Sequence, residues 1–343
     1  MLKALETGRM ILRQFTQDDF EAVHSYGSVP ENIIYMPFSP NTQEDTRAFL
    51  IRSIAAAEET PCRNYQYAAV LRDTGKIIGG CGVNLSGDEA EIGWLLHRDF
   101  WKQGFGPEMG RALLAFGFDE LHMHRIIARC DAENYGSYRV MEKIGMRREG
   151  LFLDARPANK LSHNKYSDEL YYAILKEEWE IQKEIEYFSG LPVHFDGFED
   201  FKEMSDGNIS LICTSKRPAV PEKKFVPAYQ FAVVKAGEKI GNIKLRIGYT
   251  DGLYYGGQIG YDIAEAHRGN GYAAAACRLL LPVAKAHGMQ KLLITNIPAN
   301  LPSRRVCEKL GARLVRLARL PEWHDLYKEG KRHVNIFEWS VEA

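Results

Sequence analysis

Residues 268–273 have the composition of a loop that binds phosphate. Gly269 and Gly271 let the backbone turn its N–H groups toward one point. The alanines that follow predict a helix, and a helix N-terminus favours anions. A second segment of this kind, residues 101–106, also precedes a predicted helix. The two candidate loops consist of Trp101, Lys102, Gln103, Gly104, Phe105 and Gly106, and of Arg268, Gly269, Asn270, Gly271, Tyr272 and Ala273.

The two loops belong to a repeat. Gly104 and Gly271 are 271 − 104 = 167 positions apart, and the same offset relates the Ile-Gly pairs at 92–93 and 259–260. So many matches at nearly one spacing indicate a duplicated unit. Downstream, an offset of 166 relates Asn134 with Asn300, Ser137 with Ser303, Val140 with Val306, Glu142 with Glu308, Lys143 with Lys309 and Gly145 with Gly311.

Each half predicts the same order of elements from its apolar pattern. Several strands precede the loop, and a helix follows it. A buried strand, a short helix and a closing strand come next. The loop-led helices are expected at residues 107–120 and 273–287, with Pro107 at the first helical position and Pro282 as a bend in the second helix.

A break in the charged helix predicted at 176–188 marks the domain boundary. The sequence Ser-Gly-Leu-Pro at 189–192 ends that helix. The chain of 343 residues is long enough for two hydrophobic cores. We therefore predict one domain at residues 1–188, a linker at 189–192 and a second domain at 193–343.

The charges of the chain are balanced. Its 44 lysines and arginines match 45 aspartates and glutamates, so no excess charge points to nucleic acid or an anionic membrane as a partner. The chain has no run of about 18 apolar residues, and residues 1–10 lack the apolar core of a signal peptide. We therefore expect a soluble cytoplasmic protein.

The cysteines and histidines show no spacing typical of a metal site. The six cysteines are scattered, without a Cys-x-x-Cys pair. His122 and His124 are close in sequence, but a loop or strand-start position explains them better than metal binding. Cys307 lies in a predicted helix and is expected to be a buried small residue rather than a nucleophile. We expect free thiols and no metal.

Both halves resemble the GCN5-related N-acetyltransferases, the GNAT superfamily. The resemblance lies in an Arg/Gln-x-x-Gly-x-Gly/Ala loop and in a later Asn-x-x-Ser helix that ends in Glu-Lys-x-Gly. The second half matches the loop with Arg268, Gly271 and Ala273, whereas the first half has Trp101 in place of Arg or Gln. With this tryptophan, the first half is similar to the branch that acetylates the N-termini of ribosomal proteins. The second half is a more divergent member.

The resemblance implies an α+β protein with two tandem acyl-CoA N-acyltransferase folds. Each fold would be a mostly antiparallel, splayed sheet flanked by helices. Acetyl-CoA would be the co-substrate, with its pyrophosphate on the loop and its pantetheine arm between two diverging strands. In the first half these strands would be 90–97 and 125–130, with backbone contacts from Trp94, Leu95 and Leu96. Backbone N–H groups at a helix N-terminus bind an anion without many basic side chains, which suits a neutral chain.

Acetyl transfer to an amine requires removal of a proton from the ammonium, stabilisation of an oxyanion and protonation of the departing thiolate. Glu91, at the start of the strand before the first loop, is the candidate general base and would act through a water. Gln258 holds this position in the second half, and an amide cannot take the proton. An exposed acid at a strand end would explain Glu91 without catalysis.

For the acid, the resemblance points to the helix after the asparagine. Many family members use a tyrosine seven residues beyond it, but these positions are Met141 and Cys307. The resemblance therefore implies Asn134 and Ser137 for cofactor contact and thiolate protonation. Asn and Ser at this spacing also form an ordinary helix N-cap, which leaves a purely structural role open. The matching residues of the second half are Asn300 and Ser303.

Two further patterns have competing interpretations. Gly104, Gly106 and Gly110 resemble a dinucleotide fingerprint, but hairpin-type strands precede them where a βαβ unit should begin. The Tyr-Tyr-Gly-Gly sequence at 254–257 could form an aromatic wall of a pocket. An exposed hairpin corner is the preferred interpretation.

We therefore predict an N-acetyltransferase that moves an acetyl group from acetyl-CoA to a primary amine, either a protein N-terminus or a small molecule. The first domain is expected to be catalytic. The alternative is a protein that binds or senses acyl-CoA and in which one or both domains are non-catalytic. The motif leaves the acceptor open, because variable loops build acceptor pockets. It also leaves open whether the chain forms a homodimer or pairs its own two domains.

Overall fold

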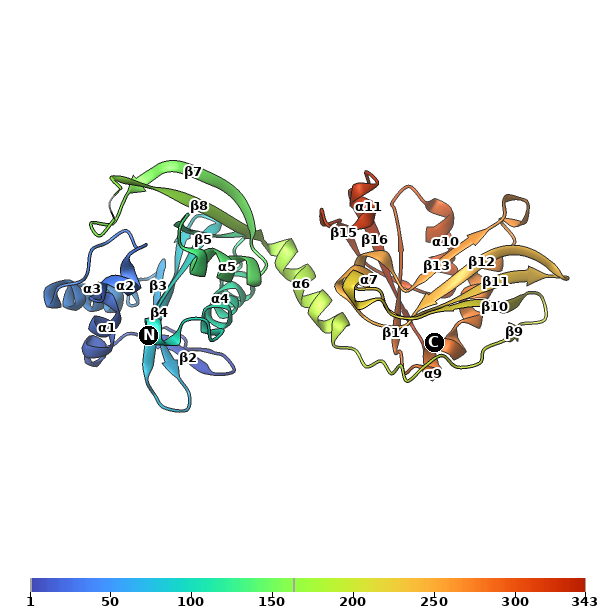
Figure 1. Cartoon of the computed structure of the whole chain (residues 1–343), viewed down its shortest axis with the longest axis horizontal. Coiled ribbons are helices and arrows are strands. Elements are labelled where there is room, and N and C mark those ends of the chain that lie inside the picture. The colour runs from blue at the N-terminus through green and yellow to red at the C-terminus, as the bar shows by residue number, and fades with distance from the viewer. Residues whose placement is uncertain (1, 163, 343) are drawn as a thin grey trace. The chain divides into compact units, whose positions relative to one another are not determined.

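The chain folds as two compact units (Figure 1). The first is Met1–Gln182 and the second is Lys183–Ala343. The computed structural model describes residues 2–162 and 164–342. No helix in these described ranges is both long enough and apolar enough to span a membrane.

The division between the units falls within helix α6 (Lys176–Ser189), ahead of the predicted linker. Contacts within each unit explain this position. Gln182 donates from Nε2 to the carbonyl of Gly145 at 3.2 Å in the first unit. Two residues later, Glu184 accepts a hydrogen bond from Arg316 Nη2 at 2.7 Å in the second unit. The helix therefore passes from one unit to the other between these two residues.

The first unit is built on one sheet of eight strands in the order β1-β2-β3-β4-β5-β6-β8-β7. Neighbouring strands are antiparallel except β5 and β6, which are parallel. The sequence does not predict β7, because its side chains are mostly exposed and lack an apolar alternation. The strands are β1 (Leu5–Glu6), β2 (Met10–Gln14), β3 (Asn64–Leu71), β4 (Ile77–Ser86), β5 (Glu89–Leu96), β6 (Arg125–Asp131), β7 (Arg147–Pro157) and β8 (Tyr166–Leu175).

Helices cover both faces of this sheet, with α1 to α3 on one side and α4 and α5 on the other (Figure 1). Thr42 begins α3 with a capping box: its hydroxyl accepts from Asp45 N at 3.1 Å, and the Asp45 carboxylate accepts from Thr42 N at 2.9 Å. The main core lies under α4, where Met109 and Leu113 are fully buried. The α-helices are α1 (Phe20–Gly27), α2 (Pro30–Ile33), α3 (Gln43–Ala56), α4 (Phe105–Ala115) and α5 (Tyr135–Lys143), and short 3-10 helices lie at Gln17–Asp19 and Arg98–Phe100.

Helix α4 corrects the predicted helix at 107–120 at both ends. It begins at Phe105, directly after Gly104, whose φ of 84° forms the N-cap. Pro107 is therefore the third helical residue rather than the first. At its other end, α4 gives way to a π-helical turn at Phe116–Glu120.

The second unit repeats these elements around two separate sheets. One has the order β13-β12-β11-β10-β9 and the other the order β14-β16-β15, and all neighbours are antiparallel. Strand β15, which follows α10 as β7 follows α5, also lacks an apolar alternation and is not predicted. The strands are β9 (Glu203–Ser205), β10 (Ser210–Arg217), β11 (Ala228–Lys235), β12 (Glu238–Arg246), β13 (Ile259–Ile263), β14 (Lys291–Asn296), β15 (Arg313–Arg319) and β16 (His333–Ser340).

The helix expected at 273–287 is two helices, α8 (Tyr272–Leu279) and α9 (Leu281–Ala286). Pro282 is the second residue of α9. It has no N–H for the carbonyl four residues earlier, so the first helix ends before it. The other helices of this unit are α7 (Asp251–Gly256), α10 (Leu301–Leu310) and α11 (Asp325–Lys328), with a 3-10 helix at Pro221–Lys223 and another at Glu265–His267.

Helix α7 overturns both interpretations of residues 254–257. Tyr254 and Tyr255 lie on this helix and are buried, so they do not form an exposed hairpin corner. The second unit has a pocket of about 1170 Å³, and neither tyrosine lines it. The Tyr254 hydroxyl instead donates to the carboxylate of Glu184. The aromatic pair therefore belongs to the core.

Candidate functional site

The two glycine loops have the same backbone conformation. In the first loop, Lys102 and Gly104 have φ values of 59° and 84°. In the second, Gly269 and Gly271 have φ values of 85° and 83°. Gly104 and Gly271 are the N-caps of α4 and α8. The N–H groups in the first turn of each helix have no partner within the helix, so each loop presents a site for an anion.

A side-chain hydrogen bond ties each loop to the strand that precedes it. Trp101 Nε1 donates to the carbonyl of Leu96 at 2.8 Å. At the positions 167 residues later, Arg268 Nε donates to the carbonyl of Ile263 at 2.9 Å. An indole and a guanidinium thus make the same contact, which we call the latch. Trp101 therefore replaces the arginine of the loop motif without loss of this bond.

The first loop has an additional support from the turn between β1 and β2. Arg9 Nη1 donates to the carbonyl of Gln103 at 3.0 Å. Glu108 accepts from Thr7 Oγ1 at 2.6 Å and from Arg9 N at 2.8 Å. Burial alone would raise the pKa of Glu108, but these hydrogen bonds outweigh it and hold the pKa below its usual value. Ala275 occupies the matching position in α8, so the second loop lacks this support.

The strands before and after the first loop separate as predicted. Strands β5 and β6 pair only from Glu89 with Arg125 to Glu91 with Ile127. Beyond Glu91 the two strands have no paired residues. Residues 94–96, which are Trp94, Leu95 and Leu96, lie past this point and lead to the loop. Among the described residues they have no strand partner on the β6 side of β5. We call this unpaired stretch the slot, and it is where the pantetheine contacts were expected.

Glu91 lies at the point where β5 and β6 separate. Its carboxylate forms a bidentate ion pair with Arg129, with Nε to Oε1 at 3.0 Å and Nη2 to Oε2 at 2.7 Å. Arg129 also lies 3.5 Å from Glu169. The hydrogen bond to Glu91 outweighs burial and raises the pKa of Arg129. The Glu91 side chain is 33% exposed, so water can reach it.

Gln258 replaces Glu91 in the second unit and has a different environment. It is 0% exposed. Its Nε2 donates to the carbonyl of Gly248 at 3.2 Å, and its Oε1 accepts from Leu293 N at 2.6 Å. Strands β13 and β14 belong to different sheets, whereas the matching strands β5 and β6 pair directly in the first unit. The side-chain amide of Gln258 connects the two strands at this position. Gln258 is a structural link between strands.

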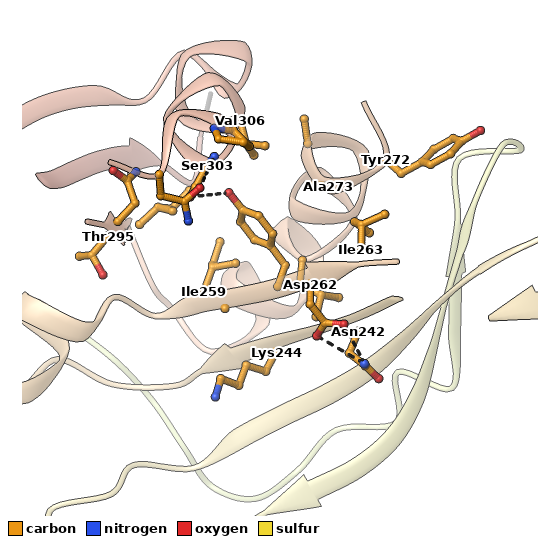
Figure 2. A pocket seen from close by; sticks show the side chains of 18 of the residues that line it. Asn242, Lys244, Ile259, Asp262, Ile263, Tyr272, Ala273, Thr295, Ser303 and Val306 are labelled. Carbon is orange, nitrogen blue, oxygen red and sulfur yellow. Dashed lines mark hydrogen bonds between the residues drawn. The ribbon is translucent and has the colours of Figure 1, made fainter. Parts of the chain in front are cut away.

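A pocket of about 1170 Å³ surrounds the second loop and passes between β13 and β14 (Figure 2). Tyr261 lies in it and shares a hydrogen bond of 3.0 Å with Ser303 Oγ. The predicted residue Asn270 is not part of the lining. Its Nδ2 donates back to the carbonyls of His267 and Arg268 at 3.2 and 3.3 Å. The predicted residues that line the pocket are Arg268, Gly269, Gly271, Tyr272, Ala273, Asn300 and Ser303.

Comparison with known proteins decides the family. Residues 9–147 and 204–313 match the family described as "Acetyltransferase (GNAT) domain", so both units are covered. The chain belongs to the GNAT family of acetyltransferases. It is 38% identical to the uncharacterized N-acetyltransferase YnaD of Bacillus subtilis over 51% of this chain and 98% of YnaD. It is 29% identical to the uncharacterized N-acetyltransferase p20 of Bacillus licheniformis, over 52% of this chain and 99% of p20.

The solved structures include a GNAT acetyltransferase from Bacillus anthracis. It is 37% identical over 51% of this chain and 99% of its own, with a TM-score of 0.45. YnaD and p20 are each matched over nearly their full length by about half of this chain. This coverage agrees with a chain made of two GNAT units, each about the size of one such relative.

The asparagines of the two GNAT units act as helix caps. Asn134 Oδ1 accepts from Ser137 N at 3.0 Å, and Asn300 Oδ1 accepts from Ser303 N at 3.1 Å. The capping role that the spacing allows is therefore present in both units. Each serine follows its cap on the first turn of α5 or α10. A cofactor contact by these residues remains a proposal.

All six cysteines of the chain are free thiols, as predicted, and four of them are buried: Cys81, Cys130, Cys277 and Cys307. Cys307 is 0% exposed, as expected, and burial raises its pKa to about 12. Asn296 Nδ2 approaches its sulfur at 3.8 Å. In residues 2–162 and 164–342, no three histidine, cysteine, aspartate or glutamate side chains are grouped to hold a metal ion.

The site contains two contacts that sequence reasoning missed. The latch joins residues five positions apart, and its geometry depends on the turn between them. The pair of Glu91 with Arg129 joins β5 to β6, and it depends on a strand register that spacing does not specify. The offset of 167 does align Trp101 with Arg268, which is the signal that could have identified the latch.

Proposed function

We propose that the first unit transfers an acetyl group from acetyl-CoA to a primary amine. The position of Glu91 carries this proposal, because its carboxylate lies where β5 and β6 separate and is open to water. The loop and the slot fit acetyl-CoA: the loop presents N–H groups to a pyrophosphate, and the slot is the unpaired stretch at residues 94–96. Acetyl-CoA supplies the activated acetyl group.

Glu91 accepts a proton from the ammonium of the acceptor through one water, which leaves a free amine. The amine nitrogen then forms a bond to the acetyl carbon, and the carbon–sulfur bond breaks. Backbone N–H groups of residues 94–96 orient the thioester in the slot. The nitrogen loses its second proton as the amide forms, and the Ser137 hydroxyl, on the first turn of α5, relays that proton to the departing thiolate and is left unchanged. Positioning of the two reactants contributes much of the rate.

The acceptor we propose is an α-amino group or a comparable small amine. An α-amino group has a pKa of about 8, so one carboxylate suffices to deprotonate it near neutral pH. One relative, the putative ribosomal N-acetyltransferase YdaF of Bacillus subtilis, is 34% identical over 28% of this chain and 50% of YdaF. The chain thus spans half the length of that relative. Its name supports testing peptides with free N-termini.

The second unit supports a different candidate function, binding of acyl-CoA without catalysis. Its loop and pocket are formed, but Gln258 is an amide and both of its side-chain polar atoms are bonded within the protein. No carboxylate therefore occupies the place of Glu91. We propose that this unit binds the cofactor or shapes a ligand site.

An amine screen with the full chain tests the proposed activity. Thiol release from acetyl-CoA would be measured with peptides that carry free N-termini, with polyamines, with aminoglycosides and with amino acids. We expect release above the rate of hydrolysis for at least one amine. Mass spectrometry of the product should show one added acetyl group. If no amine accelerates thiol release from acetyl-CoA, acetyl transfer to amines is contradicted, and binding of acyl-CoA without catalysis is the remaining function.

The latch gives a prediction about cofactor affinity. Trp101→Phe removes the donor to Leu96 and is expected to raise the KM for acetyl-CoA about fivefold, the effect of one hydrogen bond worth about 1 kcal/mol. Trp101→Arg can restore the donor as Arg268 does, so its KM should stay near that of the wild type. The exposed Trp323 provides a control as Trp323→Phe. Equal KM values for Trp101→Phe and the wild type would show that the latch does not support the loop.

A further inference from the structure

Three cationic side chains lie together on one face of the second sheet. Lys244 and Arg246 are two residues apart on β12 and therefore point to the same side. Arg217 on β10 lies in line with Arg246, because both residues are paired with Ala228 of the strand between them. All three line the pocket of about 1170 Å³. We call them the cation row.

The cation row has no carboxylate partner in the described ranges 2–162 and 164–342. Arg246 Nη1 donates to the carbonyl of Gly257 at 3.0 Å, and a carbonyl does not neutralise the charge of the guanidinium. Asp262 is the acidic residue of the pocket lining, and Asn242 Nδ2 donates to both of its carboxylate oxygens at 3.4 and 3.2 Å. The lysine and arginine residues of the lining are Arg217, Lys244, Arg246, Arg268, Arg305 and Lys309.

The surroundings of the cation row disfavour its positive charge. Burial, followed by repulsion from Arg246 and Arg217, lowers the pKa of Lys244. Burial lowers the pKa of Arg246. Lys244 and Arg246 are half-buried cations that repel each other, and this arrangement is costly unless an anion joins them. A bound anion would remove this cost.

The cation row lies on the side of the sheet away from the helices that follow the loop. Figure 2 shows Lys244 on one side of β13, and Ser303 and Val306 on the other. Gly260, directly opposite Lys244 on β13, has no side chain in the way. A Cβ added to Gly260 would lie 3.0 Å from Lys244 Cε, so the lysine extends across this strand toward the gap before β14. A ligand on this side is separate from a pyrophosphate on the loop.

The first unit has no such row at the matching positions. Gly82 pairs with Gly93 as Lys244 pairs with Gly260. Asn84 pairs with Glu91 in the first unit. The residues at these two positions in the second unit are Arg246 and Gln258, and Arg246 N donates to the Gln258 carbonyl. The first unit instead has the Glu91 carboxylate on this side. The two halves of the repeat therefore differ on this face: the first has a carboxylate on β5, and the second has cations on β12 and β10.

We propose that the cation row of the second unit binds the anionic group of a small molecule, a carboxylate or a phosphate. The ligand enters the pocket from the β12 side, while the loop side holds the cofactor. Arg217 and Lys244 contact the anion and Arg246 forms the base of the site. This inference does not depend on catalysis in the first unit. The second unit thus acts as a binding domain for an acidic ligand.

Calorimetric titration of the full chain at low ionic strength tests this proposal. The probes are succinate and inorganic phosphate, with succinamide as the neutral match of succinate. We expect binding of at least one anion and none of succinamide. Lys244→Gln is expected to weaken the anion about tenfold, as for a charge-assisted hydrogen bond. Arg217→Gln should weaken anion binding as well. Because Arg217 is exposed, misfolding would not explain such a loss of affinity.

Lys239→Gln is the matched control, because Lys239 is an exposed lysine at the other end of β12 and does not line the pocket. It should leave anion affinity unchanged. If Lys239→Gln and Lys244→Gln weaken anion binding equally, the loss of affinity comes from the change in net charge, and the proposal is wrong. Failure of both anions to bind the wild type would also overturn it. A third contrary result is weaker binding of coenzyme A, rather than of the anions, in Lys244→Gln.

Discussion

Glu91→Gln is expected to lower kcat for amine acetylation about 100-fold, the usual contribution of a general base. Glutamine preserves the size of the side chain and can still accept a hydrogen bond from Arg129. It cannot accept the proton of the ammonium. The KM for acetyl-CoA should change little, because Glu91 lies at the start of the slot and not at the loop. Steady-state kinetics with thiol detection measures both constants.

Two other variants separate proton transfer from the ion pair. Glu89 lies two residues earlier on the same face of β5 and pairs with Arg125 at 2.8 Å. Glu89→Gln thus removes a similar pair away from the point where the strands separate, and kcat should fall less than about threefold, within the range of a surface pair. Arg129→Gln keeps the carboxylate and should retain most of the activity. If all three variants lose activity equally, Glu91 is a structural residue and the proposed base is wrong.

Gln258→Glu is expected to destabilise the second unit by about 2–4 kcal/mol, because it leaves a buried carboxylate without adequate partners. Nε2 is lost as the donor to Gly248, so two oxygens would face each other. Strands β13 and β14 share no sheet, and the amide of Gln258 links them. Hydrogen exchange of peptides from β13 and β14 should therefore increase. The substitution should also fail to confer proton transfer on this unit.

The loss of stability in Gln258→Glu should depend on pH. Burial raises the pKa of a carboxyl group, so the folded variant binds more protons than the unfolded one. The destabilisation is therefore largest near neutral pH and shrinks as the pH falls. Gln290→Glu, at an exposed position, is the control and should be close to neutral. Equal and pH-independent stability of both variants would show that Gln258 does not link the strands.

The loops and the duplicated fold follow from the sequence because they rest on local patterns. Gly104 and Gly271 have φ values that favour glycine, and they occur at a fixed spacing ahead of apolar helices. The strand before each loop has an apolar pattern that indicates burial. These features need no knowledge of distant contacts, so they could be predicted.

The contacts within the site depend on tertiary structure and could not be predicted in the same way. The pairing of Glu91 with Arg129 requires the short parallel register of β5 and β6. The cation row requires β10, β11 and β12 to align Arg217 with Arg246. In both cases residues far apart in sequence meet through a sheet, and a change of one residue in register would turn them to the opposite face. The division of the chain within α6 also depends on contacts between residues far apart in sequence, so the local pattern does not reveal it.

The latch residues and their neighbours show how the first loop keeps a positive charge after losing its arginine. In the second loop, Arg268 both forms the latch and supplies the charge, and Gly269 then adopts its φ of 85° without steric cost. In the first loop, Trp101 forms the latch and the charge moves to Lys102, which has a φ of 59°. A side chain in this left-handed region costs about 1 kcal/mol. The first unit therefore holds a strained lysine in its proposed phosphate loop, and the ammonium of this lysine takes no part in the latch.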